Sequence, residues 1–189
     1  VFEGATLLGI ATVSSGTWSF TTAALSDGNH SFTAQATDNA GNVTTTSAVT
    51  ATIDTTTATN LSASESYTED TPLNLTDIVV SDVDSANVTA TLTLSNLAAG
   101  SLSTATSGAV TSTFSAGVWT ASGAIADVNA LLAGVTFSPA TNFNGSFTVT
   151  TSVSDGVAPA ITGIKAFTGT AVNDAPTATN LNAPETYTE

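Results

Sequence analysis

The sequence Thr57-Ala-Thr-Asn-Leu-Ser-Ala-Ser-Glu-Ser-Tyr-Thr-Glu69 returns almost unchanged as Thr177-Ala-Thr-Asn-Leu-Asn-Ala-Pro-Glu-Thr-Tyr-Thr-Glu189, 120 positions later. Upstream, Ala51–Asp54 aligns in the same way with Ala171–Asp174. This period is too long for a solenoid repeat and matches one whole domain. The repeat therefore predicts a tandem array of domains within a longer polypeptide. We assign a first domain to residues 1–56, a second to 57–176 and the start of a third to 177–189.

The charge balance is strongly acidic. Fifteen Asp and Glu residues accompany a single cationic side chain, Lys165, which gives a formal net charge of −14. Nucleic-acid binding requires Lys and Arg to displace counterions from phosphates, so this class of partner is excluded. The sign of the charge also excludes anionic membrane surfaces, and no apolar run approaches the roughly 20 residues of a membrane span. We expect the carboxylates to be balanced by water or by a multivalent cation.

Alternating side chains predict extended structure over much of the chain. Ser31–Thr37 and Ser146–Val153 alternate apolar and hydroxyl residues, as half-buried strands do. Branched Thr and Val favour extended backbone, and turn signals such as Asp27-Gly28-Asn29 and Asn144-Gly145 separate the runs. We therefore predict an all-β fold of tandem β-sandwich domains rather than a disordered linker.

The two domains differ in completeness. In the first, strands are predicted over 5–13, 17–22, 30–37 and 43–53. Because an immunoglobulin-type sandwich needs about seven strands, the first domain is expected to be incomplete. In the second, strands are predicted over 73–75, 87–94, 109–114, 118–121, 146–153 and 162–172. One short helix is predicted over Asp127–Gly134, with Asp127 as its N-cap and Gly134 at its end.

Two sets of motifs together cover nearly the whole chain. The first set resembles bacterial Ig-like repeats: Gly4–Gly9, Gly16–Phe20, Leu25–Phe32 and Ala36–Asn42. The second set resembles bacterial cadherin-like repeats: Tyr67–Leu73, Ser81–Asp84, Phe137–Gly145, Val153–Gly156 and Val172–Pro176. This resemblance implies modules of giant repetitive bacterial surface adhesins of the RTX type, exported by type I secretion.

Several acids recur at corresponding places around the two linkers. Each linker acid is followed fifteen residues later by another, at what we take to be the head of the next domain, and a D-x-D pair follows in the second domain. Several oxygen ligands without His or Cys suit Ca²⁺, so we expect calcium sites at the junctions, although solvated turn carboxylates remain the alternative. The cadherin-like resemblance implies the same use for Glu69, Asp82, Asp84 and the linker acid. The candidate ligands are Asp38, Asp54, Glu69, Asp82, Asp84, Asp155, Asp174 and Glu189.

Other notable residues are expected to be structural. Trp18 and Trp119 share a Gly-Thr/Val-Trp context and are interpreted as core or rim anchors rather than sugar platforms. The single His, His30, is interpreted as a surface residue at a strand edge, because no second His or nucleophile accompanies it. No catalytic or cofactor-binding residue is assigned. Turn and cap roles are assigned to Asp27, Asp77 and Asp127.

The sequence thus favours a non-enzymatic spacer of a large bacterial extracellular adhesin or surface filament, stiffened by Ca²⁺ between neighbouring repeats. A cysteine-free, acidic, Thr-rich repeat fits export to the bacterial surface or matrix. Two alternatives stay open. One is a module that binds surface glycans or assembles with other copies of the chain, laterally or by strand exchange. The other is an accessory region of a secreted polysaccharide-active enzyme.

Overall fold

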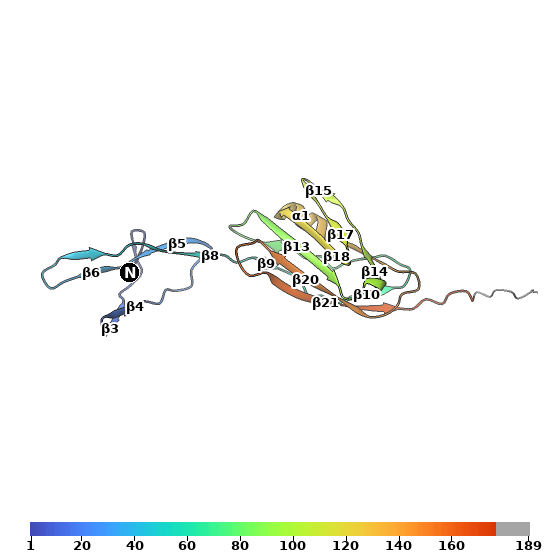
Figure 1. Ribbon diagram of the computed structural model, residues 1–189, viewed down its shortest axis with the longest axis horizontal. Coiled ribbons are helices and arrows are strands. Elements are labelled where there is room, and N and C mark those ends of the chain that lie inside the picture. The colour runs from blue at the N-terminus through green and yellow to red at the C-terminus, as the bar shows by residue number, and fades with distance from the viewer. Residues whose placement is uncertain (177–189) are drawn as a thin grey trace, which may run out of the picture.

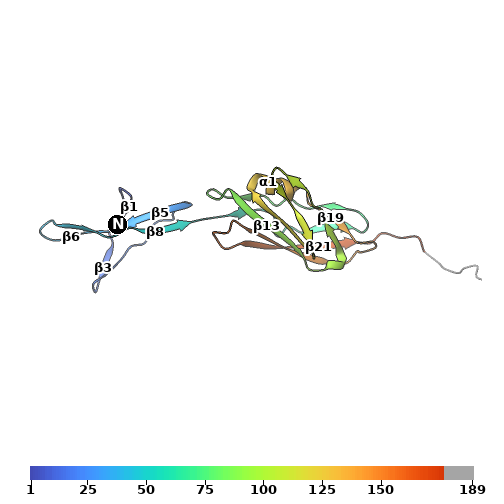
Figure 2. The ribbon, with the colours of Figure 1, turned by 45° about the horizontal axis from the view of Figure 1, so that its top comes forward.

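The computed structural model describes residues 1–176, which form a first lobe (1–53) and a second lobe (57–176) joined by a short extended segment (54–56) (Figures 1 and 2). The regular elements are strands apart from helix α1 (Ile125–Ala133) and one 3₁₀ turn over Leu97–Ala99, so the predicted all-β fold is confirmed. Glu189, one of the predicted ligands, and the start of the third domain lie outside the described residues. Within them, no helix is long and apolar enough to cross a membrane.

The first lobe is a set of short ladders. Its main sheet has the order β2-β1-β5-β8, and two separate hairpins pair β3 with β4 and β6 with β7. The predicted strands 30–37 and 43–53 are each interrupted, because Ala34 donates its N–H to Thr46 Oγ1 where the pairing changes from one ladder to the other. The strands are β1 (Phe2–Glu3), β2 (Thr6–Leu7), β3 (Thr12–Ser14), β4 (Thr17–Ser19), β5 (Gly28–Thr33), β6 (Gln35–Thr37), β7 (Val43–Thr45) and β8 (Val49–Ile53).

The second lobe is a β-sandwich. A larger sheet has the order β10-β21-β20-β13-β18-β17, and a smaller one the order β11-β19-β14. The short pairs β9–β12 and β15–β16 complete it. The larger sheet contains β10 (Glu65–Thr68), β13 (Asn87–Leu94), β17 (Thr113–Ser115), β18 (Val118–Ala124), β20 (Phe147–Ser154) and β21 (Ile161–Thr170). The remaining strands are β9 (Thr57–Ala58), β11 (Leu73–Asn74), β12 (Val80–Ser81), β14 (Gly100–Leu102), β15 (Thr106–Ser107), β16 (Val110–Thr111) and β19 (Thr136–Pro139).

The core lies between the two sheets of the second lobe. Strand β13 turns Val88, Ala90, Leu92 and Leu94 inward, and all four are buried. Across the sandwich, Phe137 of the smaller sheet meets Phe147 and Phe167 of the larger sheet at centroid distances of 5.0 and 5.5 Å. Every buried apolar side chain of residues 1–176 lies between Tyr67 and Phe167, so the first lobe contributes none.

Helix α1 begins earlier than predicted. It starts at Ile125, its N-cap is Ala124, and no side chain caps it. Asp127 therefore lies within the first turn, where a carboxylate is favourable near the helix N-terminus, and it accepts a hydrogen bond from Ser107 Oγ at 3.2 Å. Gly134 follows the last helical residue, as predicted. The helix buries Val128, Leu131 and Leu132 against the sandwich.

Candidate metal centre

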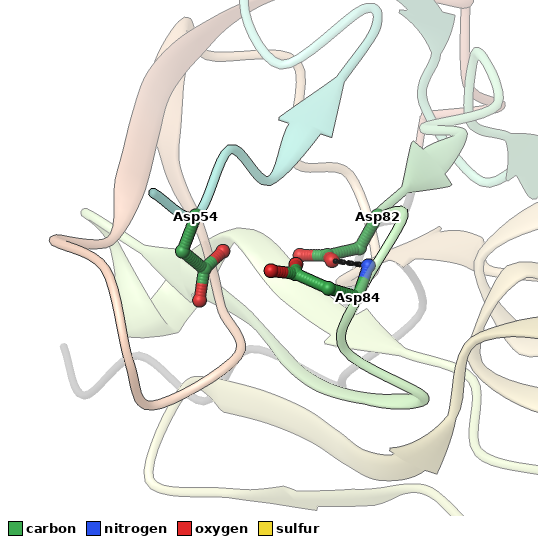
Figure 3. A group of neighbouring side chains, drawn as sticks. All are labelled: Asp54, Asp82 and Asp84. Carbon is green, nitrogen blue, oxygen red and sulfur yellow. Dashed lines mark hydrogen bonds between the residues drawn. The ribbon is translucent and has the colours of Figure 1, made fainter. Parts of the chain in front are cut away.

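Three carboxylates meet where the first lobe passes into the second (Figure 3). Asp54 directly follows β8, and Asp82 and Asp84 lie in the loop after β12. One carboxylate oxygen from each of the three lies within 4.8 Å of the others. The linker acid and the D-x-D pair therefore converge, as the sequence predicted for a junction.

The D-x-D loop is held by its own first carboxylate. Asp82 Oδ1 accepts hydrogen bonds from the N–H groups of Asp84 and Ser85, at 3.1 and 2.8 Å. Its Oδ2 accepts from Thr56 Oγ1 at 2.7 Å, which ties the loop to the linker. Asp and Ser side chains readily form such local turns. The loop therefore presents Asp84 toward Asp54, with Asp82 serving both as a loop brace and as a member of the cluster.

A fourth acid joins from the loop between β20 and β21. Asp155 Oδ2 accepts a hydrogen bond from Ser85 Oγ at 3.0 Å, and its Oδ1 accepts from the N–H groups of Val157 and Ala158. The N–H of Val157, outweighing the effect of burial, lowers the pKa of Asp155 to about 2, with help from Asp54 and Ser85. This carboxylate is therefore ionised at neutral pH and faces the cluster as a permanent negative charge.

The cluster concentrates negative charge that no cation of this chain balances. Burial raises the pKa of Asp54 to about 6, together with a hydrogen bond to Asp155 and the charges of Asp155, Asp84 and Asp82. Burial opposes the ionisation of Asp82, yet the N–H of Ser85 and the hydroxyl of Thr56 hold its pKa below its usual value. Lys165, the only Lys or Arg of the chain, pairs with Glu65 instead.

One buried oxygen of the cluster has no hydrogen-bond donor among the described residues. Asp54 Oδ1 is enclosed and accepts no hydrogen bond from any described residue. A buried carboxylate oxygen without a partner is costly, and a bound cation removes that cost. The donors here are carboxylate oxygens from three chain segments, the ligand type that Ca²⁺ prefers. These residues therefore fit a hard divalent cation.

Sequence reasoning missed a contribution from the first lobe. Asp27, which we interpreted as a turn residue, adds its charge to the burial and to Asp82 in raising the pKa of Asp84. His30, which was expected at the surface, is instead buried and lies between Glu3 and the Ser26 carbonyl. The order of residues in the chain already indicated that Asp27 lies near Asp54. Ser26 and Asp27 directly precede β5, and the first residue of β5 pairs with Ile53, the neighbour of Asp54.

Three predicted ligands do not join this cluster. Glu69 follows β10, which runs parallel to the end of β21, so it lies at the end of β21 opposite to Asp155. At about 3.3 Å per residue, the ten residues of β21 separate these ends by roughly 33 Å. Glu69 is buried and accepts hydrogen bonds from Asn144 Nδ2 and the N–H of Val172. Our placement of Glu69 at the head of its domain, beside Asp82 and Asp84, was wrong.

Asp174 and Asp38 also lie away from this cluster, and for Asp174 this agrees with its predicted place at the second linker. Asp174 is exposed and follows the end of β21, near Glu69 rather than Asp155. Asp38 lies in the β6–β7 hairpin, on the side of the first lobe away from the second (Figure 1). Its carboxylate is occupied by Ala40 N, Asn42 N and Asn42 Nδ2 within its own turn. Asp155 precedes β21 and Asp174 follows it, so the two acids lie at opposite ends of the second lobe.

The first lobe is thus an open set of antiparallel ladders joined to a β-sandwich. Residues 1–55 match the family model described as bacterial Ig-like domain, and this part of the chain is similar to that family. No curated protein matches the chain.

Proposed function

We propose that this chain is a non-enzymatic spacer segment of a bacterial extracellular surface protein, in which Ca²⁺ bound between successive domains fixes the linker. The observation that carries the proposal is the position of Asp54. It ends the last strand of the first lobe, and its carboxylate lies among Asp82 and Asp84 of the second. A cation bound by all three would restrain the hinge and cancel the repulsion between its two sides.

The expected affinity is modest. Extracellular calcium modules bind with Kd of about 10⁻⁴ to 10⁻³ M. Millimolar calcium that binds only the folded junction then stabilises it by roughly 0.4 to 1.4 kcal/mol. This suits a device that stiffens in calcium-rich surroundings and loosens without it. Its role in the adhesin would be to carry another domain away from the cell surface.

The test compares residues 1–176 with two variants of equal charge. Asp84→Asn removes a cluster carboxylate that is not used to brace its own loop, and Asp77→Asn removes an exposed acid outside the cluster. Calorimetric titration should show calcium binding to the natural chain and to Asp77→Asn, and at least tenfold weaker binding to Asp84→Asn. Small-angle scattering should show a longer maximum dimension with calcium than with chelator. No heat of binding and no change in dimension would refute the calcium-stiffened spacer.

A second candidate function, assembly with another copy of the chain, is favoured by the first lobe. Its exposed apolar residues include Ile10, 91% exposed, and Trp18, 53% exposed, beside Leu7 and Val13. These side chains form an apolar surface, which favours packing against a protein segment over recognition of a hydroxyl-rich glycan. Light scattering across a concentration series should then show dimers or larger species of residues 1–176, and Trp18→Ser should reduce them. A monomer at every concentration would remove this candidate.

A further inference from the structure

The only Lys or Arg of the chain lies where a charge is most costly. Lys165 is on β21, and its side chain is 0% exposed. Its Nζ donates to Glu65 Oε1 at 2.9 Å and to the carbonyl oxygen of Thr76 at 3.1 Å. Glu65, with a side chain 4% exposed, also accepts from the N–H and the hydroxyl of Thr76. An acidic chain with no other Lys or Arg therefore uses its one ammonium group inside the sandwich, not on its surface.

A buried ion pair of this kind is a poor source of equilibrium stability. Replacing both partners by apolar residues is often neutral or stabilising, whereas removing one partner costs about 3–5 kcal/mol because the other charge is left buried and unpaired. The pair does, however, favour a strand pairing that brings Glu65 and Lys165 together over a pairing that separates them. The strands concerned are the two that carry these residues, β10 and β21.

That pairing is a parallel ladder between the beginning and the end of the second lobe. In β10, Glu65 pairs with Phe167 and Thr68 with Thr170. The same offset continues upstream, where Ile164 N–H donates to Ser62 Oγ at 3.2 Å. A Cβ added at Gly163 would lie 2.6 Å from Leu61, so the absence of a side chain there lets the entering segment lie directly on β21.

Because the ladder is parallel, a force that pulls the chain ends apart acts along its strands. The chain enters the lobe at β9, at the end nearer the first lobe, and leaves at the far end of β21 (Figure 1). Pulling the two ends apart therefore slides β10 against its parallel partner along their common axis. The hydrogen bonds of the ladder are then loaded together rather than opened one at a time.

We propose that the Glu65–Lys165 pair is a mechanical lock, an ion pair that holds this ladder in register when the chain is stretched. A slip of two residues keeps the inward alternation of Glu65 and Tyr67, so burial alone opposes it weakly. The same slip moves Glu65 by about 6.6 Å along β21, out of its 2.9 Å bond to Lys165 Nζ and out of its bonds to the N–H and hydroxyl of Thr76. The lock acts inside the second lobe and does not depend on a cation at the junction.

The test separates mechanical from thermal stability. Residues 1–176 are stretched between their ends by single-molecule force spectroscopy with a chelator present, which isolates the result from the calcium proposal. The Glu65→Leu/Lys165→Leu variant should melt at or above the temperature of the natural chain and yet unfold at a lower force. Its control, Ser66→Ala/Thr168→Ala, changes an outward pair of the same ladder and should leave the unfolding force unchanged.

A second variant covers the case in which two leucines do not pack. Glu65→Gln/Lys165→Met keeps the volumes and an amide that can accept from Thr76, and the same fall in unfolding force is expected of it. An unchanged unfolding force in a folded double variant overturns the lock. A fall in force that is matched by an equal fall in melting temperature also overturns it, because the pair would then contribute only ordinary stability.

Discussion

Each lobe contains a hairpin with the same turn geometry, but the Trp that follows the turn is exposed in the first lobe and buried in the second. Ser15-Gly16 and Ala116-Gly117 both have positive φ, at 49° and 80° in the first and 51° and 79° in the second, and each is followed two residues later by Trp. Such paired positive φ values fit the twist of a tight hairpin. Trp18 nevertheless stays 53% exposed, whereas Trp119 is 0% exposed. Local sequence sets the turn, and a second layer decides whether the aromatic ring is buried.

That second layer exists only around Trp119 within residues 1–176. Its indole Nε1 donates to the carbonyl oxygen of Ser103, which comes just after β14 of the opposing sheet. In the first lobe, Trp18 is exposed, and so are Leu7, Val13, Val43 and Val49. The two lobes therefore differ in the amount of apolar surface that folding removes from water, which is the main favourable term in folding.

The largest expected effect is the loss of cooperative unfolding in the first lobe. Residues 57–176 expressed alone should show one cooperative thermal transition by circular dichroism, because they contain the whole buried core. Residues 1–56 alone should show none. A sharp, concentration-independent transition of residues 1–56 as a monomer would show that the first lobe is stabilised without a second layer.

The next effect sharpens the contrast between the two Trp residues. In residues 1–176, Trp119→Ala should destabilise the second lobe by about 3–5 kcal/mol, because it removes a fully buried ring and leaves a cavity. Trp18→Ala should leave the melting temperature of the second lobe unchanged. Denaturant unfolding followed by circular dichroism measures both. A comparable loss in both variants would mean that the lobes unfold as one unit.

A smaller difference in stability is expected when the glycine of each hairpin turn, Gly16 or Gly117, is replaced by alanine. Gly117→Ala should destabilise the second lobe, because alanine at positive φ costs about 1–2 kcal/mol; the side chain of Leu97, 65% exposed, can move away from the added Cβ. Gly16→Ala imposes the same backbone cost in open space, since nothing lies within 4 Å of the added Cβ. Thermal melts of the two variants of residues 1–176 should therefore differ, with only Gly117→Ala lowering the transition. Equal melts would show that the positive φ of Gly117 adds nothing to the stability of the second lobe.

The smallest effect is a pH dependence confined to the first lobe. Both ring nitrogens of His30 face acceptors, the Ser26 carbonyl and the Glu3 carboxylate, so the ring must donate twice and be protonated. The hydrogen bond to Ser26, followed by that to Glu3, raises the pKa of His30 above 6.5. Protonation therefore stabilises this region below pH 6.5, and the contribution is lost as pH rises through the raised pKa.

Nuclear magnetic resonance titration of His30 measures that pKa directly. Glu3→Gln should lower it, while Asp77→Asn, which changes a carboxylate of the second lobe, should not. Amide exchange in β1 and β5 should become faster above the pKa of His30, with no change in β13. A His30 pKa at or below 6.5 would contradict the double hydrogen bond.

Much of the second lobe could be predicted from residue patterns. The strand predicted over Asn87–Leu94 has the same bounds in the structure, and those predicted near 146–153 and 162–172 are shifted by one or two residues at their ends. Alternation was strong there because one face of each strand is buried. The helix was also predicted, but its start was displaced, since Asp127 looks like a cap and functions as a first-turn acid bonded to Ser107.

The candidate site was predicted only in part. The convergence of Asp54 with Asp82 and Asp84 followed from their places at the linker and at the first loops of the second lobe. Asp155 was predicted at the second linker, together with Asp174, and this placement was wrong: it joins the first cluster through Ser85, because it precedes β21 whereas Asp174 follows it. Glu69 was misplaced because its position depends on the direction in which β10 pairs with β21, which sequence spacing does not contain.

The sequence by itself determined the 120-residue period of the repeated stretch, the extended backbone, the hairpin turns and the excess of carboxylates, because these follow from residue identity and order. Only the tertiary structure decided which end of a strand each acid occupies, that the single Lys lies buried against Glu65, and that Trp18 and Trp119 have different surroundings. The physical reason is that burial and charge pairing depend on which segments pack together, and segments such as β10 and β21 are about 100 positions apart in the chain.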